Sequence, residues 1–442
     1  MPSDGPGGHT AQVVDASLAV FLTAGGSRAY AEIFGVAAGV TFLATPLVRR
    51  FVVAAGVIDQ PSDRRVHPKP TPTMGGLAMY LGFLAALGLS RVVPFFRDVN
   101  GASPEPLAAL VACTLMVGLG AIDDTRGTTA LSKITAQVFI AGVVVLFGVR
   151  FAYSWAPWLP GNGIVVLSGD LPVILTIVFV VSVANAVNLV DGLDGLAAGM
   201  VAIAASAFFI FMVRSPSSFF GEASQAALLS AITVGICLGF LPWNFFPARI
   251  FMGDTGSMLL GMLLAIATIS GVGNNPRPPS PGELAAPLAL VVVPLLVLAV
   301  PILDVVLAIL RRTWRGQGIG HADKEHLHHR LMEIGHGHRQ AVLLMYLWSA
   351  LISGCGLAIG LIDGRFVVGL ILVGAAALFS ATAFPRLARR RNGEHAVPVQ
   401  DNGSKEHGPV IGPVIAAGPD LPREPAPEAS PEATSGLPPV AP

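Results

Sequence analysis

The stretch LPVILTIVFVVSVANAVNLVDGLDG, residues 171–195, decides the fold class. It opens with an almost uninterrupted apolar run, and a helix needs about 20 such residues to cross the hydrocarbon core of a bilayer. Two aspartates and two glycines follow directly after the apolar run. The pattern predicts a membrane-spanning helix that ends in a polar segment at one membrane face.

The whole chain shares this apolar character. Hydrophobic residues make up 53% of its 442 residues and charged residues only 12%, whereas a soluble protein holds about 25% charged residues. The formal net charge is zero, so bulk charge offers nothing to attract a nucleic acid, and we expect no such partner. The three cysteines lie far apart in apolar runs and predict neither a disulfide framework nor a metal site.

Apolar runs of similar length recur along the chain. They predict an all-α, polytopic integral membrane protein with about 11 transmembrane helices. No convincing internal repeat accompanies them. The predicted spans are 30–53, 74–94, 106–122, 131–149, 171–188, 195–213, 225–243, 255–272, 284–310, 341–362 and 366–385.

Polar segments flank this membrane region on both sides. Residues 1–28 are predicted to form a mostly polar lead-in, and residues 29–385 the membrane-embedded domain. Four arginines follow soon after residue 385, and eleven of the 35 prolines lie between Pro398 and Pro442. Such a composition is typical of disorder, so residues 386–442 are predicted to form a disordered Pro-rich tail.

Lysines and arginines are distributed unevenly over the predicted loops. One set of alternate loops, together with the C-terminal tail, carries 20 of the 27 cations, and the opposite set carries 7. Because cytoplasmic loops hold an excess of Lys and Arg, the first set and the C-terminus are predicted to be cytoplasmic.

The unusual polar clusters all fall on this predicted cytoplasmic side. Their one-sidedness predicts a site at one membrane face that is built from several loops. The clusters are DQPSDRRVHPKPTPTMGG (59–76), GAIDDTRG (120–127), NAVNLVDGLDGLAAG (185–199), WNFFPARIFMGDTGS (243–257) and HADKEHLHHRLMEIGHGHR (321–339).

Acidic residues in these clusters are the main catalytic candidates. Asp123 and Asp124 fall at a helix end, where their charges oppose the helix dipole and favour a compensating cation; a plain helix terminus in water is the alternative. Asp191 and Asp194 share one face with Asn188 if the segment is helical, or belong to a glycine-rich turn in which Asp194 caps the next helix. Asp254 could likewise cap the helix that follows it.

Acids gathered at one membrane face repel one another unless a cation joins them. Oxygen ligands of this kind suit Mg²⁺, with Mn²⁺ as a substitute. The first and last cytoplasmic loops add Arg, Lys and His side chains that suit an anion. Carboxylates, a divalent metal and basic donors together predict a site for phosphoryl transfer.

The histidine-rich stretch 321–339 allows three interpretations. His326, His328 and His329 have no nearby Cys and match a zinc site weakly. A solvated loop explains the charges but not the clustering of imidazoles. An anion site for a diphosphate explains both, and the residues alone leave the three interpretations open.

The ordered set of five motifs resembles the polyprenyl-phosphate N-acetylhexosamine-1-phosphate transferases, the membrane family that includes phospho-MurNAc-pentapeptide translocase. The similarity extends over about 30–385. DKEHLHHRL (323–331), followed by GHGHRQAVLLMY, resembles the branch that uses UDP-N-acetylglucosamine, whereas TPTMGG (71–76) is also found in the translocases.

The resemblance implies a Mg²⁺-dependent reaction in which polyprenyl (undecaprenyl or decaprenyl) phosphate and UDP-GlcNAc give polyprenyl-diphospho-GlcNAc and UMP. This would start cell-wall or surface glycan synthesis at the cytoplasmic face of a bacterial plasma membrane, with a homodimer as the assembly found in the family. Phospho-MurNAc-pentapeptide transfer is the alternative within the family. A secondary transporter is a distant alternative, since its site would lie near the midplane between repeated halves.

The resemblance also assigns roles to single residues. It implies catalytic roles for Asp123, Asp124, Asp191 and Asp194, and metal binding by Asp254 with Asp123. It implies substrate binding by Lys69, Asn188, Asn244, Phe251, His326, His328, His329 and Arg330.

Overall fold

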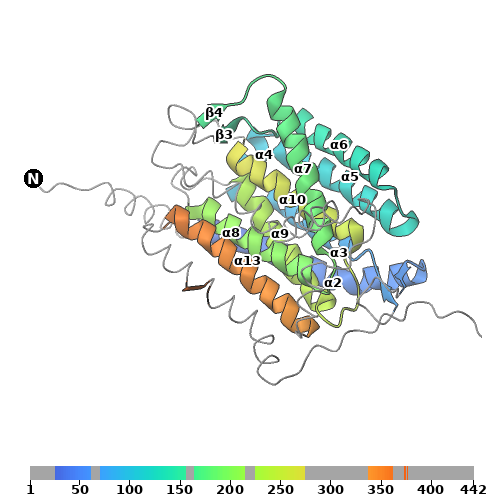
Figure 1. Ribbon diagram of the computed structural model, residues 1–442. Coiled ribbons are helices and arrows are strands. Elements are labelled where there is room, and N and C mark those ends of the chain that lie inside the picture. The colour runs from blue at the N-terminus through green and yellow to red at the C-terminus, as the bar shows by residue number, and fades with distance from the viewer. Residues whose placement is uncertain are drawn as a thin grey trace, which may run out of the picture. The chain divides into compact units, whose positions relative to one another are not determined.

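A computed structural model describes residues 25–60, 70–155, 164–214, 224–273 and 337–361, with residues 373, 374 and 376. The described chain is a helical bundle (Figure 1). Its α-helices are α2 (Gly26–Ala54), α3 (Gly76–Ser90), α4 (Arg97–Ala102), α5 (Glu105–Arg126), α6 (Ala130–Leu146), α7 (Leu171–Val190), α8 (Leu196–Arg214), α9 (Gln225–Asn244), α10 (Gly253–Thr268) and α13 (His338–Leu361).

Shorter elements complete the described part of the chain. A 3₁₀ turn covers Pro94–Phe96, and a π-helical turn, Ile269–Gly273, extends α10. Strands β1 (Ile58–Asp59) and β2 (Thr71–Pro72) pair antiparallel, as do β3 (Tyr153–Trp155) and β4 (Ile164–Val166). Among the described residues, β structure is confined to these two short ladders, so the all-α prediction describes the bundle itself.

Nine of the eleven predicted spans coincide with helices. Six helical segments are long and apolar enough to cross a membrane, which confirms a polytopic membrane protein, while α3 and α6 are shorter apolar helices. The predicted span 284–310 and nearly all of 366–385 lie outside the described residues, as do the tail 386–442 and most of the lead-in 1–28. The total of eleven spans therefore stays a prediction.

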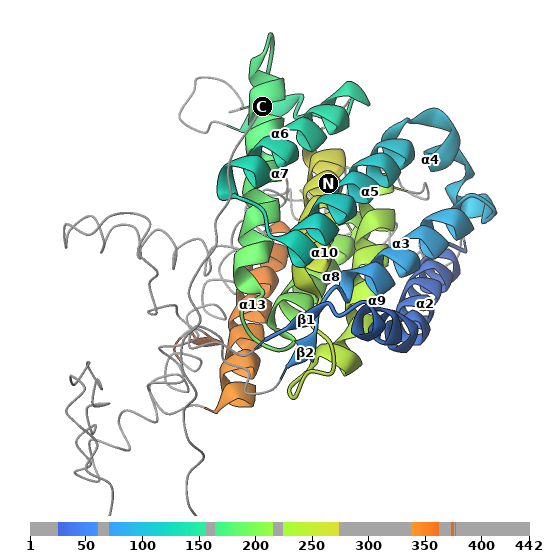
Figure 2. The same ribbon diagram turned by 90° about the vertical axis from the view of Figure 1, so that its right-hand side faces the viewer.

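Helix α10 lies at the centre of the bundle (Figures 1 and 2). It contacts α3, α5, α7 and α9, and every residue from Thr255 to Thr268 is buried. A helix that is apolar on all sides is expected to be enclosed in this way. Small residues let neighbours approach closely, since a Cβ at Gly120 or Gly261 would lie 2.5 Å from the α10 or α7 backbone, as is common between membrane helices.

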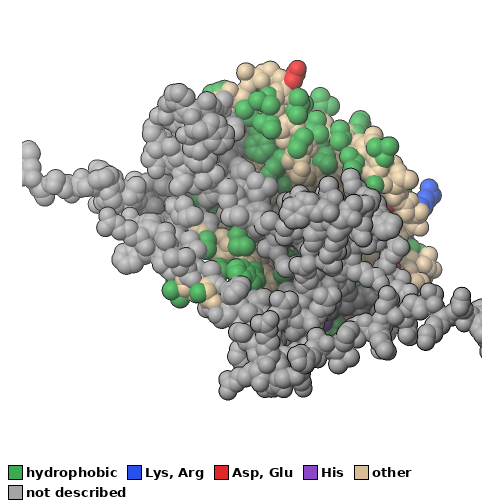
Figure 3. Space-filling model, viewed as in Figure 1, with side chains coloured by type: hydrophobic (Ala, Val, Ile, Leu, Met, Phe, Trp, Pro, Cys, Tyr) green, Lys and Arg blue, Asp and Glu red, His purple; other side chains and the backbone are tan. Residues whose placement is uncertain are grey.

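The outer helices present apolar side chains to their surroundings. Leu131, Ile134 and Phe139 of α6 are exposed, as are Ile174 and Val178 of α7. Figure 3 shows hydrophobic side chains gathered over this part of the molecule, with few charged groups among them. Exposed apolar surface of this extent is expected of helices that face lipid.

Candidate active site

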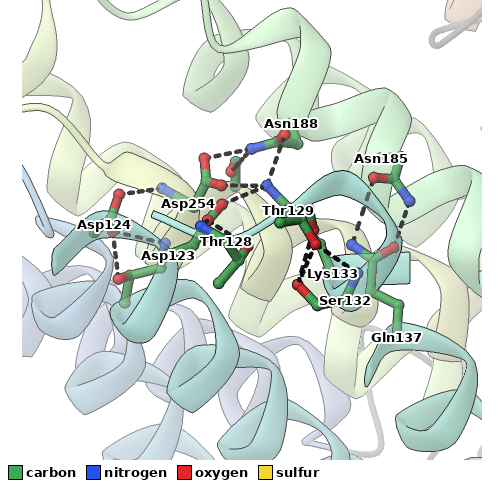
Figure 4. Close-up of polar contacts among 12 residues, drawn as sticks. Asp123, Asp124, Thr128, Thr129, Ser132, Lys133, Gln137, Asn185, Asn188 and Asp254 are labelled. Carbon is green, nitrogen blue, oxygen red and sulfur yellow. Dashed lines mark hydrogen bonds and ion pairs between the residues drawn. The ribbon is translucent and has the colours of Figure 1, made fainter. Parts of the chain in front are cut away.

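A lysine ammonium joins three helices to α6 at one end of the bundle (Figure 4). The Nζ atom of Lys133 on α6 lies 2.8 Å from Asp123 Oδ2 on α5 and also pairs with Asp254 Oδ2 on α10. It donates a further hydrogen bond of 3.3 Å to Asn188 Oδ1 on α7. Only 14% of the Lys133 side chain and 13% of the Asp123 side chain are exposed, so water screens this pair less than a surface ion pair.

Hydrogen bonds orient the groups around Lys133. The Asn188 amide donates to Asp254 Oδ1 at 2.7 Å and to Ser257 Oγ at 2.9 Å, which turns its oxygen toward the lysine. Asp123 Oδ1 accepts from the backbone N–H of Thr128 at 2.7 Å and from the Thr128 hydroxyl. Three residues predicted from separate motifs thus meet at one cation, Lys133, which supplies the compensating charge for Asp123.

Asp124, next to Asp123 in the chain, makes a different set of contacts. Its carboxylate accepts from the backbone N–H of Asp254 at 2.9 Å, the N–H of Thr255 at 3.0 Å and the Thr255 hydroxyl at 2.6 Å. These are first-turn donors of α10, which have no partner inside the helix. An acceptor from α5 therefore caps α10, and Asp254, a possible cap from sequence, does not act as one.

The close approach of Asp124 depends on Gly253. Its φ is +69°, and an added Cβ would lie 2.5 Å from Asp124 Oδ2 and 2.6 Å from Thr73 Oγ1. A left-handed φ favours glycine. The local sequence M-G-D-T therefore gives α10 a start at which the carboxylate of another helix can reach the backbone.

The segment Asp191–Gly195 is a turn between α7 and α8, as in the second of the two interpretations above, but the recorded contact of the Asp194 side chain is to another loop and not to the start of α8. Asp194 Oδ2 accepts from the backbone N–H of Ala248 at 2.9 Å, and so holds the loop between α9 and α10. Loss of hydration on burial, followed by the charges of Asp254, Asp124 and Asp194, raises the pKa of Asp191 well above its ordinary value. Asp191 therefore lies near the other acids but lacks a cation among the described residues.

Asn244 and Phe251 make hydrogen bonds that connect neighbouring loops of the site to one another. Asn244 is 2% exposed; its oxygen accepts from Gly195 N at 3.0 Å and its amide donates to Ile250 O at 3.1 Å. The backbone N–H of Phe251 donates to Pro72 O, and its carbonyl accepts from Gly75 N, both at 2.8 Å. Substrate contacts of these two side chains stay predictions.

The described ends of the first and last polar clusters both contact the loop between α9 and α10. Residues 71–76 meet Phe251 and Gly253 through the contacts given above. At the start of α13, the His338 ring stacks on Phe246 at 4.3 Å between centroids, and Arg339 donates to Phe246 O at 3.2 Å. The described parts of all five clusters therefore gather at one end of the bundle, as their one-sidedness predicts.

Five predicted site residues lie outside the described part of the chain: Lys69, His326, His328, His329 and Arg330. Conversely, Lys133 was not among the predicted site residues. The available signal was its position within the apolar segment 131–149, because an ionisable residue inside a predicted span is a functional candidate by default.

Oxygen donors dominate the site. Among the described residues, no three His, Cys, Asp or Glu side chains are grouped closely enough to hold a metal on their own. Mg²⁺ commonly takes one or two protein carboxylates and fills its remaining positions with water and substrate phosphate. Asp123 and Asp254, whose oxygens already converge on one cation, fit that requirement.

Comparison with known proteins identifies the chain. Residues 106–272, which extend from the second residue of α5 beyond the end of α10, match the model of glycosyl transferase family 4. A relative from Mycobacterium leprae (strain TN), named decaprenyl-phosphate N-acetylglucosaminephosphotransferase, is 41% identical over 363 residues, which cover 80% of this chain and 90% of that relative. The chain belongs to glycosyl transferase family 4.

Further relatives carry names of the same kind. A Bacillus subtilis (strain 168) protein, named probable undecaprenyl-phosphate N-acetylglucosaminyl 1-phosphate transferase, is 35% identical over 69% of this chain and 77% of its own length. An Escherichia coli (strain K12) protein, named undecaprenyl-phosphate alpha-N-acetylglucosaminyl 1-phosphate transferase, is 28% identical over 70% of this chain and 78% of its own. The resemblance drawn from the five motifs is confirmed.

Proposed function

We propose that this family 4 member transfers GlcNAc-1-phosphate from UDP-GlcNAc to a polyprenyl phosphate, giving polyprenyl-diphospho-GlcNAc and UMP. The observation that carries the proposal is the convergence of Asp123, Asn188 and Asp254, from three helices, on one cation position. The relatives at 40% and 41% identity are named for decaprenyl phosphate, which favours decaprenyl phosphate as the acceptor.

The reaction forms one P–O bond and breaks another. An oxygen of the lipid phosphate attacks the phosphorus that carries GlcNAc, and UMP leaves with the electron pair of the broken bond. A phosphomonoester is largely dianionic at pH 7, because its second pKa is about 6. The attacking oxygen therefore needs no general base, and Asp123 acts as a partner of cations.

Charge is the main obstacle to this reaction. Two anionic phosphates must approach carboxylates in a partly dehydrated site, where repulsion is stronger than in water. Lys133 supplies one positive charge, and Asp254 with Asp123 would hold Mg²⁺. When bound, Mg²⁺ would neutralise charge on the phosphate oxygens. The predicted diphosphate contacts of His326, His328, His329 and Arg330 would add donors from the last polar cluster.

The site is proposed to face the cytoplasm of a bacterial plasma membrane. The polar clusters at this end of the bundle belong to the loop set that, together with the C-terminal tail, carries 20 of the 27 cations, and such loops stay cytoplasmic. UDP-GlcNAc would then enter from the cytosol and the polyprenyl chain from the membrane. The product would serve cell-wall or surface glycan synthesis.

A donor comparison tests the proposal. Purified protein is incubated with decaprenyl phosphate and Mg²⁺, with either UDP-[¹⁴C]GlcNAc or UDP-MurNAc-[¹⁴C]pentapeptide, and the lipid is extracted. We expect label in the lipid phase from UDP-GlcNAc alone, with one UMP released per labelled lipid. Label from the pentapeptide donor alone would replace the proposed sugar with the alternative one, and no conversion of either donor would contradict the proposed activity.

A further inference from the structure

A second polar contact joins α6 to α7 next to the Lys133 cluster (Figure 4). The Asn185 amide donates to Gln137 Oε1 at 2.5 Å, and the Gln137 amide donates back to Asn185 Oδ1 at 3.5 Å. Asn185 also donates to Val181 O at 2.8 Å, one turn earlier on α7. Gln137 is fully buried. Asn185 opens the polar cluster 185–199, but neither side chain has been given a role in the predicted or described site.

The spacing links this amide pair to the site. Gln137 follows Lys133 by four residues and Asn185 precedes Asn188 by three, so each pair lies on one helix face. Two contacts, Lys133 with Asn188 and Gln137 with Asn185, therefore connect the same two faces. They are separated by about 6 Å along α6 and by about 4.5 Å along α7. The first contact carries the site's charge, and the second lies deeper in the apolar bundle.

Helix α6 needs such a contact more than the inner helices do. In the described part of the chain, its substantial helix contacts are with α5 and α7 alone, and its outer face carries exposed Leu131, Ile134 and Phe139. Apolar packing on one side leaves rotation and sliding of a helix weakly specified. A directional amide pair inside an apolar region specifies both, because unpaired amides there are costly.

We propose that Gln137 and Asn185 are positioning residues that fix the rotation and depth of α6 against α7. They thereby place the Lys133 ammonium between Asp123 and Asp254. A lysine side chain has a flexible four-carbon stem, so the direction in which its helix presents it decides where the ammonium lies. The part of the proposal that concerns turnover rests on the proposed function.

The test uses four variants and one matched control. Gln137→Met and Asn185→Leu each leave one amide unpaired, Gln137→Met/Asn185→Leu replaces both amides with apolar side chains, and Gln137→Asn/Asn185→Gln exchanges them. Tyr80→Phe removes another contact between helices, the 2.7 Å hydrogen bond from Tyr80 on α3 to Thr114 on α5. The control reports what loss of any one such bond does.

The first readout needs no enzymatic activity. Purified full-length protein is treated with an acetylating reagent, and acetylation of Lys133 is followed by mass spectrometry relative to Lys405, one of four lysines in the chain. We expect each single variant and the apolar double variant to acetylate Lys133 several-fold faster than wild type. The exchanged pair and Tyr80→Phe should match wild type. Unchanged acetylation in the single variants would overturn the proposal.

The second readout separates positioning from packing. In the single and apolar double variants we expect kcat to fall about 10–100-fold, the cost of a displacement near 1 Å, with little change in KM for UDP-GlcNAc. The exchanged pair should recover most of the loss. An apolar double variant with wild-type kcat would show that packing suffices and would overturn the proposal. An inactive wild type with the expected acetylation pattern would contradict the proposed function and leave the positioning role supported.

Discussion

Two pairs of aspartates, one at the end of α5 and one in the turn after α7, show the same division between two kinds of contact. In each pair one carboxylate binds backbone N–H groups of another segment: Asp124 holds the start of α10, and Asp194 holds Ala248. The other member of each pair faces the remaining acids. Aspartates close together in the sequence can thus make quite different contacts, one with backbone N–H groups and the other with charged groups.

The two pairs differ in their counter-charge. Asp123 has Lys133 at 2.8 Å, whereas Asp191 lies among acids without a cation in the described part of the chain, and its pKa is raised. Asp123 therefore has a counter-charge from the protein itself before substrate binds. Under the proposed function, the counter-charge of Asp191 would come from a bound metal or from the last polar cluster.

The largest effect is expected from Asp254→Asn, because Asp254 interacts electrostatically with groups of both aspartate pairs. It pairs with Lys133 and contributes to the repulsion felt by Asp191. The amide keeps the shape of the side chain but removes the charge that faces Lys133 and that would bind the proposed Mg²⁺. We expect turnover to fall by several orders of magnitude with an unchanged elution volume in gel filtration. Turnover near wild type would place the metal elsewhere.

Lys133→Met should come next. It leaves Asp123 and Asp254 facing each other and removes one positive charge from the phosphates. We expect kcat to fall about 10²–10³-fold, the usual cost of one stabilising donor at a reaction centre, when transfer of labelled GlcNAc to lipid is measured. Lys405→Met, in the C-terminal tail, serves as control. Equal rates for the two variants would remove Lys133 from the site.

Asp124→Ala should act mainly on stability, in contrast to Asp123→Ala. It removes the cap of α10, and a lost cap costs about 0.5–2 kcal/mol. We expect Tm, measured by scanning fluorimetry in detergent, to fall by several degrees in Asp124→Ala and by less in Asp124→Asn, which keeps one acceptor oxygen. An unchanged Tm in Asp124→Ala would break the assignment of this residue to the α10 start.

Asp191→Asn should give the smallest and most pH-dependent effect. A carboxyl pKa that is raised in the folded state destabilises the fold at any pH above the unfolded value near 4, and the penalty grows until the folded pKa is passed. Removing the charge should therefore raise Tm in chelator by a few degrees at pH 8 and by less at pH 5. A lower Tm at pH 8 would show that Asp191 is already compensated.

The helices were predictable because the length and apolar composition of each run are enough to indicate a membrane-spanning helix. Spans 171–188 and 225–243, for example, fall within one or two residues of α7 and α9. The turn after α7 was predictable only as one of two interpretations, because the glycines of DGLDG suit either. Gathering of the polar clusters at one end followed from the alternation of spans.

Partners of the acids were harder to predict. The position of Lys133 inside the predicted span 131–149 marks it as a candidate, but no local sequence pattern points to its partner Asp254, which lies 121 residues away. The donors to Asp124 are backbone N–H groups 130 and 131 residues away. Every residue except proline has such a group, so no side-chain motif could have predicted these two donors. Close helix packing at Gly120 and Gly253 creates these contacts, and packing of this kind is a property of the whole bundle.

Exchange of labelled UMP into UDP-GlcNAc, measured with and without EDTA, tests the central claim most directly. Exchange reports the chemical step at the site and depends on every charge discussed above. We predict that chelator abolishes exchange and that added Mg²⁺, or Mn²⁺ in its place, restores it. Full exchange in chelator would show that Lys133 and the basic loop suffice, and would contradict a reaction centred on carboxylates that share a divalent cation.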